Sequence, residues 1–398
     1  MMNLHRPLNV LVFLLLIATT GCQQLLDEVG NQKGLAELKD LVLNQYGEHH
    51  NVPPLPADLA EKFAYTSNAT ATELRLKNET ANYYHFKGVL SAQDAPHIRN
   101  FPSFLSTSEG HYYIRFEFFV SKRVPLGVPG PLVIQIPPLG SGGTVEADIA
   151  DYYTSRATGA HCLVVYPDHA AASIDQPIDQ TNQYFIRNTV AIQQALDFVL
   201  AVSNLNVVPV RIDPSSIFSM GISLGGLMNA YLIAVEPRIK KGVIIMGGGQ
   251  IASIISHSRE PSVTEYREFW REKLFQLGLT WMPNDTSFEG YLHSIMKIDP
   301  ITLAPYVLSK RVSMIISKDD SVVPTQHQYG LWFAYGRPAM SLVDYKLYDQ
   351  LGISHNEYGV PFELPTGGLP TGHFDIVFAK KQVLDYTWNQ FIYAKLTP

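Results

Sequence analysis

The sequence predicts an α/β fold, with a mainly parallel sheet of eight strands flanked by helices. Apolar segments rich in branched and aromatic residues recur along the chain, and several are apolar throughout, as expected for strands covered on both faces. Between them lie segments whose apolar residues are three or four positions apart, as in amphipathic helices. Because strands that alternate with helices are joined by right-handed crossovers, we expect most of the sheet to be parallel.

Each expected element has a defined range. The expected strands are residues 82–90, 111–120, 130–140, 161–168, 216–223, 241–249, 311–320 and 341–350. The clearest helical patterns cover residues 188–205, 225–237 and 381–395.

Residues 250–300 interrupt this alternation. They carry no strand pattern, and they contain the large aromatic residues Phe269, Trp270, Phe275, Trp281 and Tyr291. We interpret this segment as a helical cap inserted after a strand of the sheet. Ordinary packing of crossover helices is the alternative.

The composition excludes some function classes. Of the 398 residues, 46% are hydrophobic and 17% charged, which is ordinary for a folded protein. The net charge is −6 and there is no basic stripe, so a nucleic-acid partner is not expected. The 13 histidines are scattered, and none belongs to a motif with metal-ligand spacing. The sequence therefore predicts neither a metal nor a cofactor.

Residues 1–21 have the features of a targeting segment. Arg6 precedes an apolar run, residues 10–18, that is too short to span a bilayer and fits a signal peptide. The run is followed by Gly21 and Cys22, which resembles a bacterial lipoprotein signal in which Cys22 is lipidated and anchors the chain to the membrane. An ordinary secretory signal, with a soluble secreted or periplasmic product, is the alternative.

Two further segments complete the domain prediction. Residues 22–80 are expected to form a tether and N-terminal extension, and residues 81–398 the main domain. The other cysteine, Cys162, lies in an apolar run and is predicted to be a buried thiol.

The segment Gly221-Ile222-Ser223-Leu224-Gly225 joins an expected strand to an expected helix. A GxSxG motif in this position is typical of a nucleophile elbow, in which the serine lies on a sharp turn above the sheet edge. A tight turn that merely requires small residues is the alternative. We predict that Ser223 is a nucleophile.

A serine nucleophile requires a base and a group that orients the base. In GxSxG enzymes the acid and then the histidine follow the serine along the chain. Asp320 follows an expected strand and is preferred over Asp319, although both could instead cap the next helix. For the base, His373 is preferred over His355, since His373 directly precedes the closing helix.

An oxyanion hole needs two backbone N–H donors. One is expected from Leu224, the residue after the serine. The other is assigned to Leu139 or Gly140, in the glycine-rich loop at residues 137–143. A phosphate-binding loop is a weaker interpretation, because no Gly-Lys-Ser/Thr sequence follows.

From about residue 80 to residue 398 the chain resembles the α/β-hydrolase superfamily, close to its dienelactone-hydrolase-like and acetyl-xylan-esterase-like branches. The elbow, the stretch DSVVP after Asp319 and the GHF at His373 carry the resemblance. It implies a serine hydrolase with a Ser223-His373-Asp320 triad and no cofactor. The substrate would be a small ester or acyl compound at the bacterial cell envelope.

The resemblance leaves alternatives open. A serine peptidase of the same fold is one, and a non-catalytic binding lipoprotein of the envelope is another. If residues 250–300 form a cap, Trp270 or Trp281 is expected to help set the acyl-chain preference of the enzyme.

Overall fold

A computed structural model describes residues 49–93, 111–139, 143–167, 178–202, 204–205, 208–279, 285–317, 320–343 and 380–396. Residues His49–Pro398 form one compact unit. Within the part of the chain that the structure describes, no helix is both long enough and apolar enough to cross a membrane.

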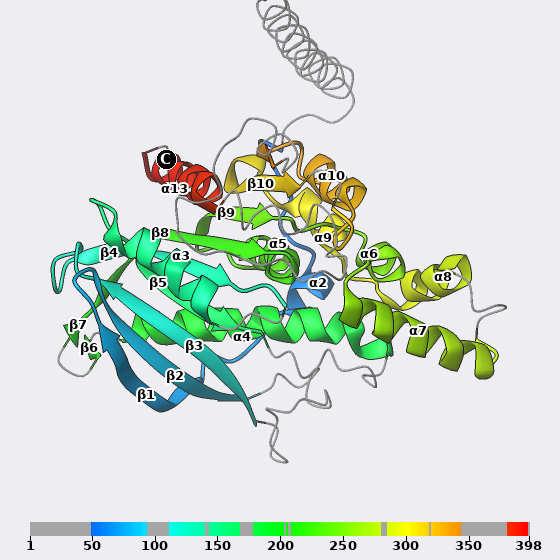
Figure 1. Cartoon of the computed structure of the whole chain (residues 1–398), viewed down its shortest axis with the longest axis horizontal. Helices are drawn as coiled ribbons and strands as arrows, with labels where there is room; N and C mark the ends of the chain where they lie inside the picture. The colour runs from blue at the N-terminus through cyan, green and yellow to red at the C-terminus, as the bar shows by residue number, and fades with distance from the viewer. Residues whose placement is uncertain are drawn as a thin grey trace, which may run out of the picture. The chain divides into compact units, whose positions relative to one another are not determined.

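The described residues contain a mixed sheet of nine strands (Figure 1). Along the sheet these are β1 (Thr70–Glu79), β2 (Tyr83–Gln93), β3 (His111–Ser121), β5 (His161–Tyr166), β4 (Pro129–Ile136), β8 (Arg211–Ile222), β9 (Ile239–Ile245), β10 (Val312–Ser317) and β11 (Ala339–Val343). From β5 to β11 every neighbouring pair is parallel, whereas β1, β2 and β3 join by antiparallel pairing. The predicted mainly parallel sheet is confirmed.

The sheet has one strand more than the eight expected. This strand, β1, pairs with β2 at the edge of the sheet and is exposed along almost its whole length. Leu74 and Leu76 alternate with charged residues, a strand pattern that the expected elements do not include. Residues 70–79, expected in the N-terminal extension, therefore contribute to the sheet.

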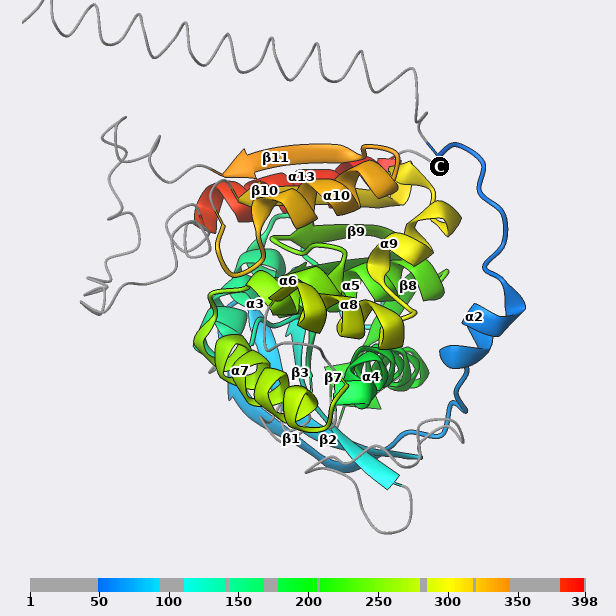
Figure 2. The same cartoon turned by 90° about the vertical axis from the view of Figure 1, so that its right-hand side faces the viewer.

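Helices flank the sheet (Figures 1 and 2). They are α2 (Ala57–Lys62), α3 (Thr144–Ser155), α4 (Thr181–Ala201), α5 (Leu224–Val235), α6 (Ile251–His257), α7 (Pro261–Gln276), α8 (Asp285–Ile295), α9 (Pro300–Leu303), α10 (Thr325–Ala334) and α13 (Lys380–Leu396). A separate two-stranded pair, β6 (Asn204–Leu205) and β7 (Val208–Pro209), follows α4.

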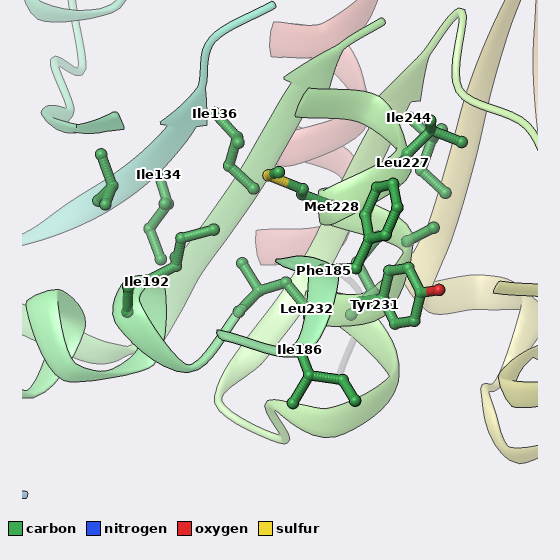
Figure 3. Packing of buried hydrophobic residues seen from close by; sticks show 14 of the residues in the cluster. Ile134, Ile136, Phe185, Ile186, Ile192, Leu227, Met228, Tyr231, Leu232 and Ile244 are labelled. Carbon is green, nitrogen blue, oxygen red and sulfur yellow. The ribbon is translucent and has the colours of Figure 1, made fainter. Parts of the chain in front are cut away.

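Alternating side chains of the parallel strands build two apolar layers. Leu132, Ile134 and Ile136 of β4 pack in the same cluster as α4 and α5, whereas Val133 packs in the cluster of α3 and α13. Figure 3 shows the first layer, where the rings of Phe185 and Tyr231 are stacked with centroids 5.6 Å apart. The strands are thus covered on both faces, which explains their continuous apolar sequences. The predicted buried thiol, Cys162, is fully buried in β5.

In its described residues, the segment predicted to form a cap, residues 250–300, is helical, which fits both a cap and ordinary crossover packing. Helices α6, α7, α8 and α9 lie between β9 and β10 in sequence, and no strand interrupts them in the described residues. The cap has its own apolar contacts with the main core through Trp270, Leu274, Phe288 and Leu292, all of them buried.

Candidate active site

Ser223 occupies the sharp turn between β8 and α5. Its backbone has φ 57° and ψ −118°, a conformation that non-glycine residues rarely adopt. The turn is held by a hydrogen bond of 2.9 Å from the Ser223 N–H to the carbonyl of Ile245, at the end of β9. Such a strained backbone costs about 1–3 kcal/mol, and it persists only where the surrounding structure enforces it.

The two glycines of the motif are required by close backbone contacts. A Cβ atom on Gly221 would lie 2.0 Å from the carbonyl oxygen of Gly225. A Cβ atom on Gly225 would lie 2.1 Å from the carbonyl oxygen of Ile136, at the end of β4. Both contacts are with backbone atoms, which cannot turn aside, so the motif brings α5, β8 and β4 together at the serine.

Two of the residues expected to form the oxyanion hole line the same cavity. Leu224 is the first residue of α5, where backbone N–H groups have no intrahelical partner and the helix dipole is positive. Leu224 and Leu139 both line a single cavity. Gly140, the other candidate, lies outside the described residues.

Asp320 is almost fully buried after β10, and the protein fixes its carboxylate. Its Oδ1 accepts hydrogen bonds from the backbone N–H groups of Val322 (2.8 Å) and Val323 (3.0 Å). Its Oδ2 accepts one from Nε2 of Gln328 at 2.8 Å. The helix that follows, α10, has Pro324 at its N-cap, so Asp320 does not have the capping role that was its alternative.

Ser223 and Asp320 lie at the same edge of the sheet. They follow β8 and β10, which are both parallel neighbours of β9. Two strand spacings of about 4.8 Å separate these positions, a gap that an imidazole ring can bridge. β11 ends at this edge too, since it runs parallel to β10, and the chain that follows β11 carries both candidate histidines.

Several predicted residues fall outside the described residues: Cys22, Trp281, Asp319, His355 and His373. Among the described residues, His327 is the histidine nearest in sequence to Asp320. Its Nδ1 lies 2.9 Å from Oε1 of Gln250, at the start of the cap. Burial lowers the pKa of His327, and the nearby His257 lowers it further.

The cavity beside Leu224 measures about 130 Å³. Its lining residues come from the loop after β4, the helices α4 and α5, and the cap helices α6 and α7: Leu139, Thr181, Tyr184, Phe185, Leu224, Leu227, Ile251, Ile254, Ile255, Ser262, Val263 and Tyr266. The cap therefore borders the same cavity as Leu224, the residue next to the candidate nucleophile.

Of the two cap residues expected to shape the pocket, Trp270 does not line the cavity, and Trp281 lies outside the described residues. Trp270 is buried and packs against Phe269 and Tyr266, with ring centroids 5.5 and 6.4 Å away. It does not belong to the cavity lining, whereas Tyr266, one turn earlier in α7, does. The spacing of Val263, Tyr266 and Trp270 places them on one helix face, but only the structure shows where along that face the cavity ends.

The described residues contain no group of three or more His, Cys, Asp or Glu side chains that could hold a metal ion.

Comparisons with known proteins agree with this architecture. No model of a known protein family matches the sequence, and no curated protein matches it either. Among solved structures, acetyl xylan esterase 1 from Thermoanaerobacterium sp. JW/SL YS485 is similar over 75% of this chain and 89% of its own, with 16% identity and a TM-score of 0.51. An acetyl xylan esterase from Paenibacillus sp. R4 covers 78% of this chain and 96% of its own, with 14% identity and a TM-score of 0.48. The likeness to the first of these structures, together with the sheet order, shows that the chain has the α/β-hydrolase fold.

Proposed function

We propose that the protein is a serine hydrolase, and specifically a carboxylic-ester hydrolase. The observation that carries the proposal is the strained turn at Ser223, which places a serine at the N-terminus of α5 and two strand positions from a buried, fixed aspartate. Such strain is typical of functional sites, where the fold stabilises a conformation that serves chemistry. Acetyl xylan esterase 1, whose structure is similar, also supports an esterase.

In the proposed reaction, Oγ of Ser223 attacks the acyl carbon of the ester while His373 takes its proton. The tetrahedral intermediate collapses, the C–O bond to the alcohol breaks, and His373 returns the proton to the leaving alcohol. Water then attacks the acyl-enzyme by the same route and releases the acid. Asp320 holds the tautomer and orientation of His373 and stabilises the imidazolium.

The negative charge of the tetrahedral intermediate falls on the former carbonyl oxygen. We assign its stabilisation to the backbone N–H of Leu224 and to a second N–H from Leu139 or Gly140. Each such donor contributes about 2.7–4 kcal/mol to lowering the barrier. The dipole of α5 acts in the same direction, because its positive end lies at Leu224.

We place this activity at the bacterial cell envelope. The proposal rests on Gly21 and Cys22 after an apolar run of signal-peptide length. Lipidation of Cys22 would anchor the chain, and residues 23–48 would link the anchor to the compact unit that begins at His49.

Labelling with a fluorophosphonate probe tests the proposal, because the probe reacts covalently with activated serines. We expect wild-type protein to be labelled and to hydrolyse p-nitrophenyl esters, and Ser223→Ala to do neither. Ser215→Ala is the control, since Ser215 is exposed on the same strand and bonds only to Asp213 in the described hydrogen bonds. If wild-type protein is neither labelled nor active, the proposal is wrong and a binding lipoprotein becomes the better interpretation. If Ser223→Ala keeps its label, the nucleophile is another serine and the proposed site is wrong.

A further inference from the structure

The cavity beside Leu224, the residue that follows Ser223, is larger and less polar than an acetyl group requires. Leu224 and Leu139, the residues proposed to hold the oxyanion, lie in its lining, so the cavity begins where the acyl carbon of a substrate would be. An acetyl group extends only one methyl beyond that carbon. We infer that this cavity binds the acyl chain of the substrate, and that the enzyme prefers unbranched, uncharged acyl groups of about four to six carbons. The inference rests on the proposed function.

The volume of the cavity sets the chain length. An apolar cavity of about 150 Å³ is known to accommodate benzene, a ring of six carbons. The cavity measures about 130 Å³, so it matches a chain of similar or slightly smaller size. Longer chains would have to extend into solvent and would gain no further apolar contact.

The lining chemistry excludes a charged acyl group. None of the described residues that line the cavity carries a charge, and most are Leu, Ile, Val or Phe. An ionised group in such a lining would lose its hydration without gaining a partner. Apolar chains, by contrast, gain free energy in proportion to the apolar area removed from water.

Two hydroxyl groups in the lining are already satisfied by the protein. The hydroxyls of Thr181 and Tyr266 lie 3.1 Å apart, and Thr181 donates to the carbonyl of Ile178 at 2.7 Å. Tyr266 can therefore donate to Thr181, and neither needs a polar group of the substrate. Burial raises the pKa of Tyr266 to about 12, which keeps its hydroxyl neutral.

The cap supplies much of the lining. Ile251, Ile254 and Ile255 come from α6, and Val263 and Tyr266 come from α7. The side chain of Val263 is the smallest aliphatic group among them and is only half-buried. A larger residue at this position would shorten the space available to an acyl chain without touching the elbow.

The first measurement is kcat/KM for p-nitrophenyl acetate, butanoate, hexanoate and decanoate. Each methylene that enters the cavity should raise kcat/KM about fourfold, from a transfer free energy of about 0.8 kcal/mol. We expect a gain of about 16-fold from acetate to butanoate, from two methylenes, and no further gain beyond hexanoate. A preference for acetate over butanoate would overturn the inference.

The second measurement uses Val263→Phe, which fills the cavity. We expect the ratio of kcat/KM for hexanoate to that for acetate to fall at least tenfold. Glu265→Phe is the matched control, because it adds the same ring on the exposed face of the same helix, and its ratio should equal the wild-type ratio. If Val263→Phe fails to fold, Ile254→Ala replaces it in the test. This variant enlarges the cavity and should raise kcat/KM for decanoate relative to kcat/KM for hexanoate. An unchanged ratio in the folded variant would overturn the inference.

A third series separates the acyl side of the substrate from the alcohol side. Methyl, butyl and hexyl acetates vary only the alcohol, and we expect their kcat/KM values to differ less than those of the acyl series. A larger gain along the alcohol series would assign the cavity to the leaving group and overturn the inference, while leaving the proposed hydrolase intact. Failure to hydrolyse any ester would overturn the proposed function itself, and the inference with it.

Discussion

Gln328 fixes the carboxylate of Asp320. Its Nε2 donates to Oδ2 of Asp320 at 2.8 Å and to the carbonyl of Val323 at 2.7 Å, while its Oε1 accepts from the N–H of Ser317 at 3.1 Å. Gln328 is fully buried. One amide from α10 thus links the end of β10 to both ends of the turn that carries the proposed acid.

Replacing this amide by a carboxylate should alter the pH dependence of the enzyme. In Gln328→Glu, two carboxylates would share one buried site, and like charges raise the pKa of one of them. We expect kcat/KM to fall about 10- to 100-fold and its acidic limb to move to higher pH. Gln276→Glu, at an exposed position of α7, should leave the profile unchanged. An unaltered profile in folded Gln328→Glu would show that Gln328 does not position the acid.

The sequence predicts those features of the site that depend on consecutive residues better than those that depend on contacts between separate helices and strands. The elbow at Ser223 is determined by five consecutive residues, so its turn could be read from the motif. The contact of Gln328 with Asp320 could not, because α10 has no marked apolar face and nothing in its sequence singles out one glutamine. The cavity role of Tyr266 depends on packing between segments far apart in the chain, which a single sequence does not encode in a readable pattern. The edge strand β1, by contrast, pairs with β2, the next strand in the chain, and its leucines alternate with charged residues, so this strand was predictable from the sequence.

Two alanine variants distinguish the candidate bases. We expect His373→Ala and Ser223→Ala each to lower kcat by about 10⁶-fold, since members of a triad act as a unit, and Asp320→Asn to lower it less. His355→Ala should retain near-wild-type turnover of p-nitrophenyl butanoate. The reverse result, with His355→Ala inactive and His373→Ala active, would identify His355 as the general base.

The close contact at Gly225 makes a substitution there costly. In Gly225→Ala the new methyl would meet the carbonyl oxygen of Ile136 at 2.1 Å, so α5 must move away from β4. We expect loss of fluorophosphonate labelling and a fall in melting temperature. Gly290→Ala is the control, because no atom lies within 4 Å of its added methyl, and in a helix alanine is favoured by up to about 1 kcal/mol. Labelling that survives in Gly225→Ala would contradict the structural account of the elbow.

The lipid anchor can be tested independently of catalysis. Wild-type protein expressed in a bacterium should incorporate labelled palmitate and sediment with membranes, whereas Cys22→Ser should do neither. Cys162→Ser is the control, since that thiol is buried in β5 and should have no bearing on lipidation. A mature wild-type protein that is free in the periplasm, with an N-terminus other than Cys22, would indicate ordinary secretion.

His161 should make the stability of the protein sensitive to mild acid. Its side chain is buried in β5, where Nδ1 accepts a hydrogen bond from the N–H of Ser121 at 3.2 Å. Burial lowers the pKa of His161 to about 4, whereas an unfolded histidine has a pKa of about 6.5. Between these values the unfolded chain binds a proton that the folded protein does not. The contribution of His161 is therefore fully present above pH 6.5 and is lost as the pH falls toward 4, by about 3 kcal/mol in total.

His161→Asn removes the titration and keeps an acceptor for the N–H of Ser121, since Oδ1 of asparagine takes the position of Nδ1. We expect the free energy of unfolding, measured with urea at pH 7.5 and pH 5.0, to decrease more in wild-type protein than in His161→Asn, by about 2 kcal/mol. Other groups titrate alike in both proteins, so this difference isolates His161. Equal decreases in the two proteins would mean that His161 takes up its proton as readily when folded as when unfolded, and that another group controls the acid sensitivity of the fold.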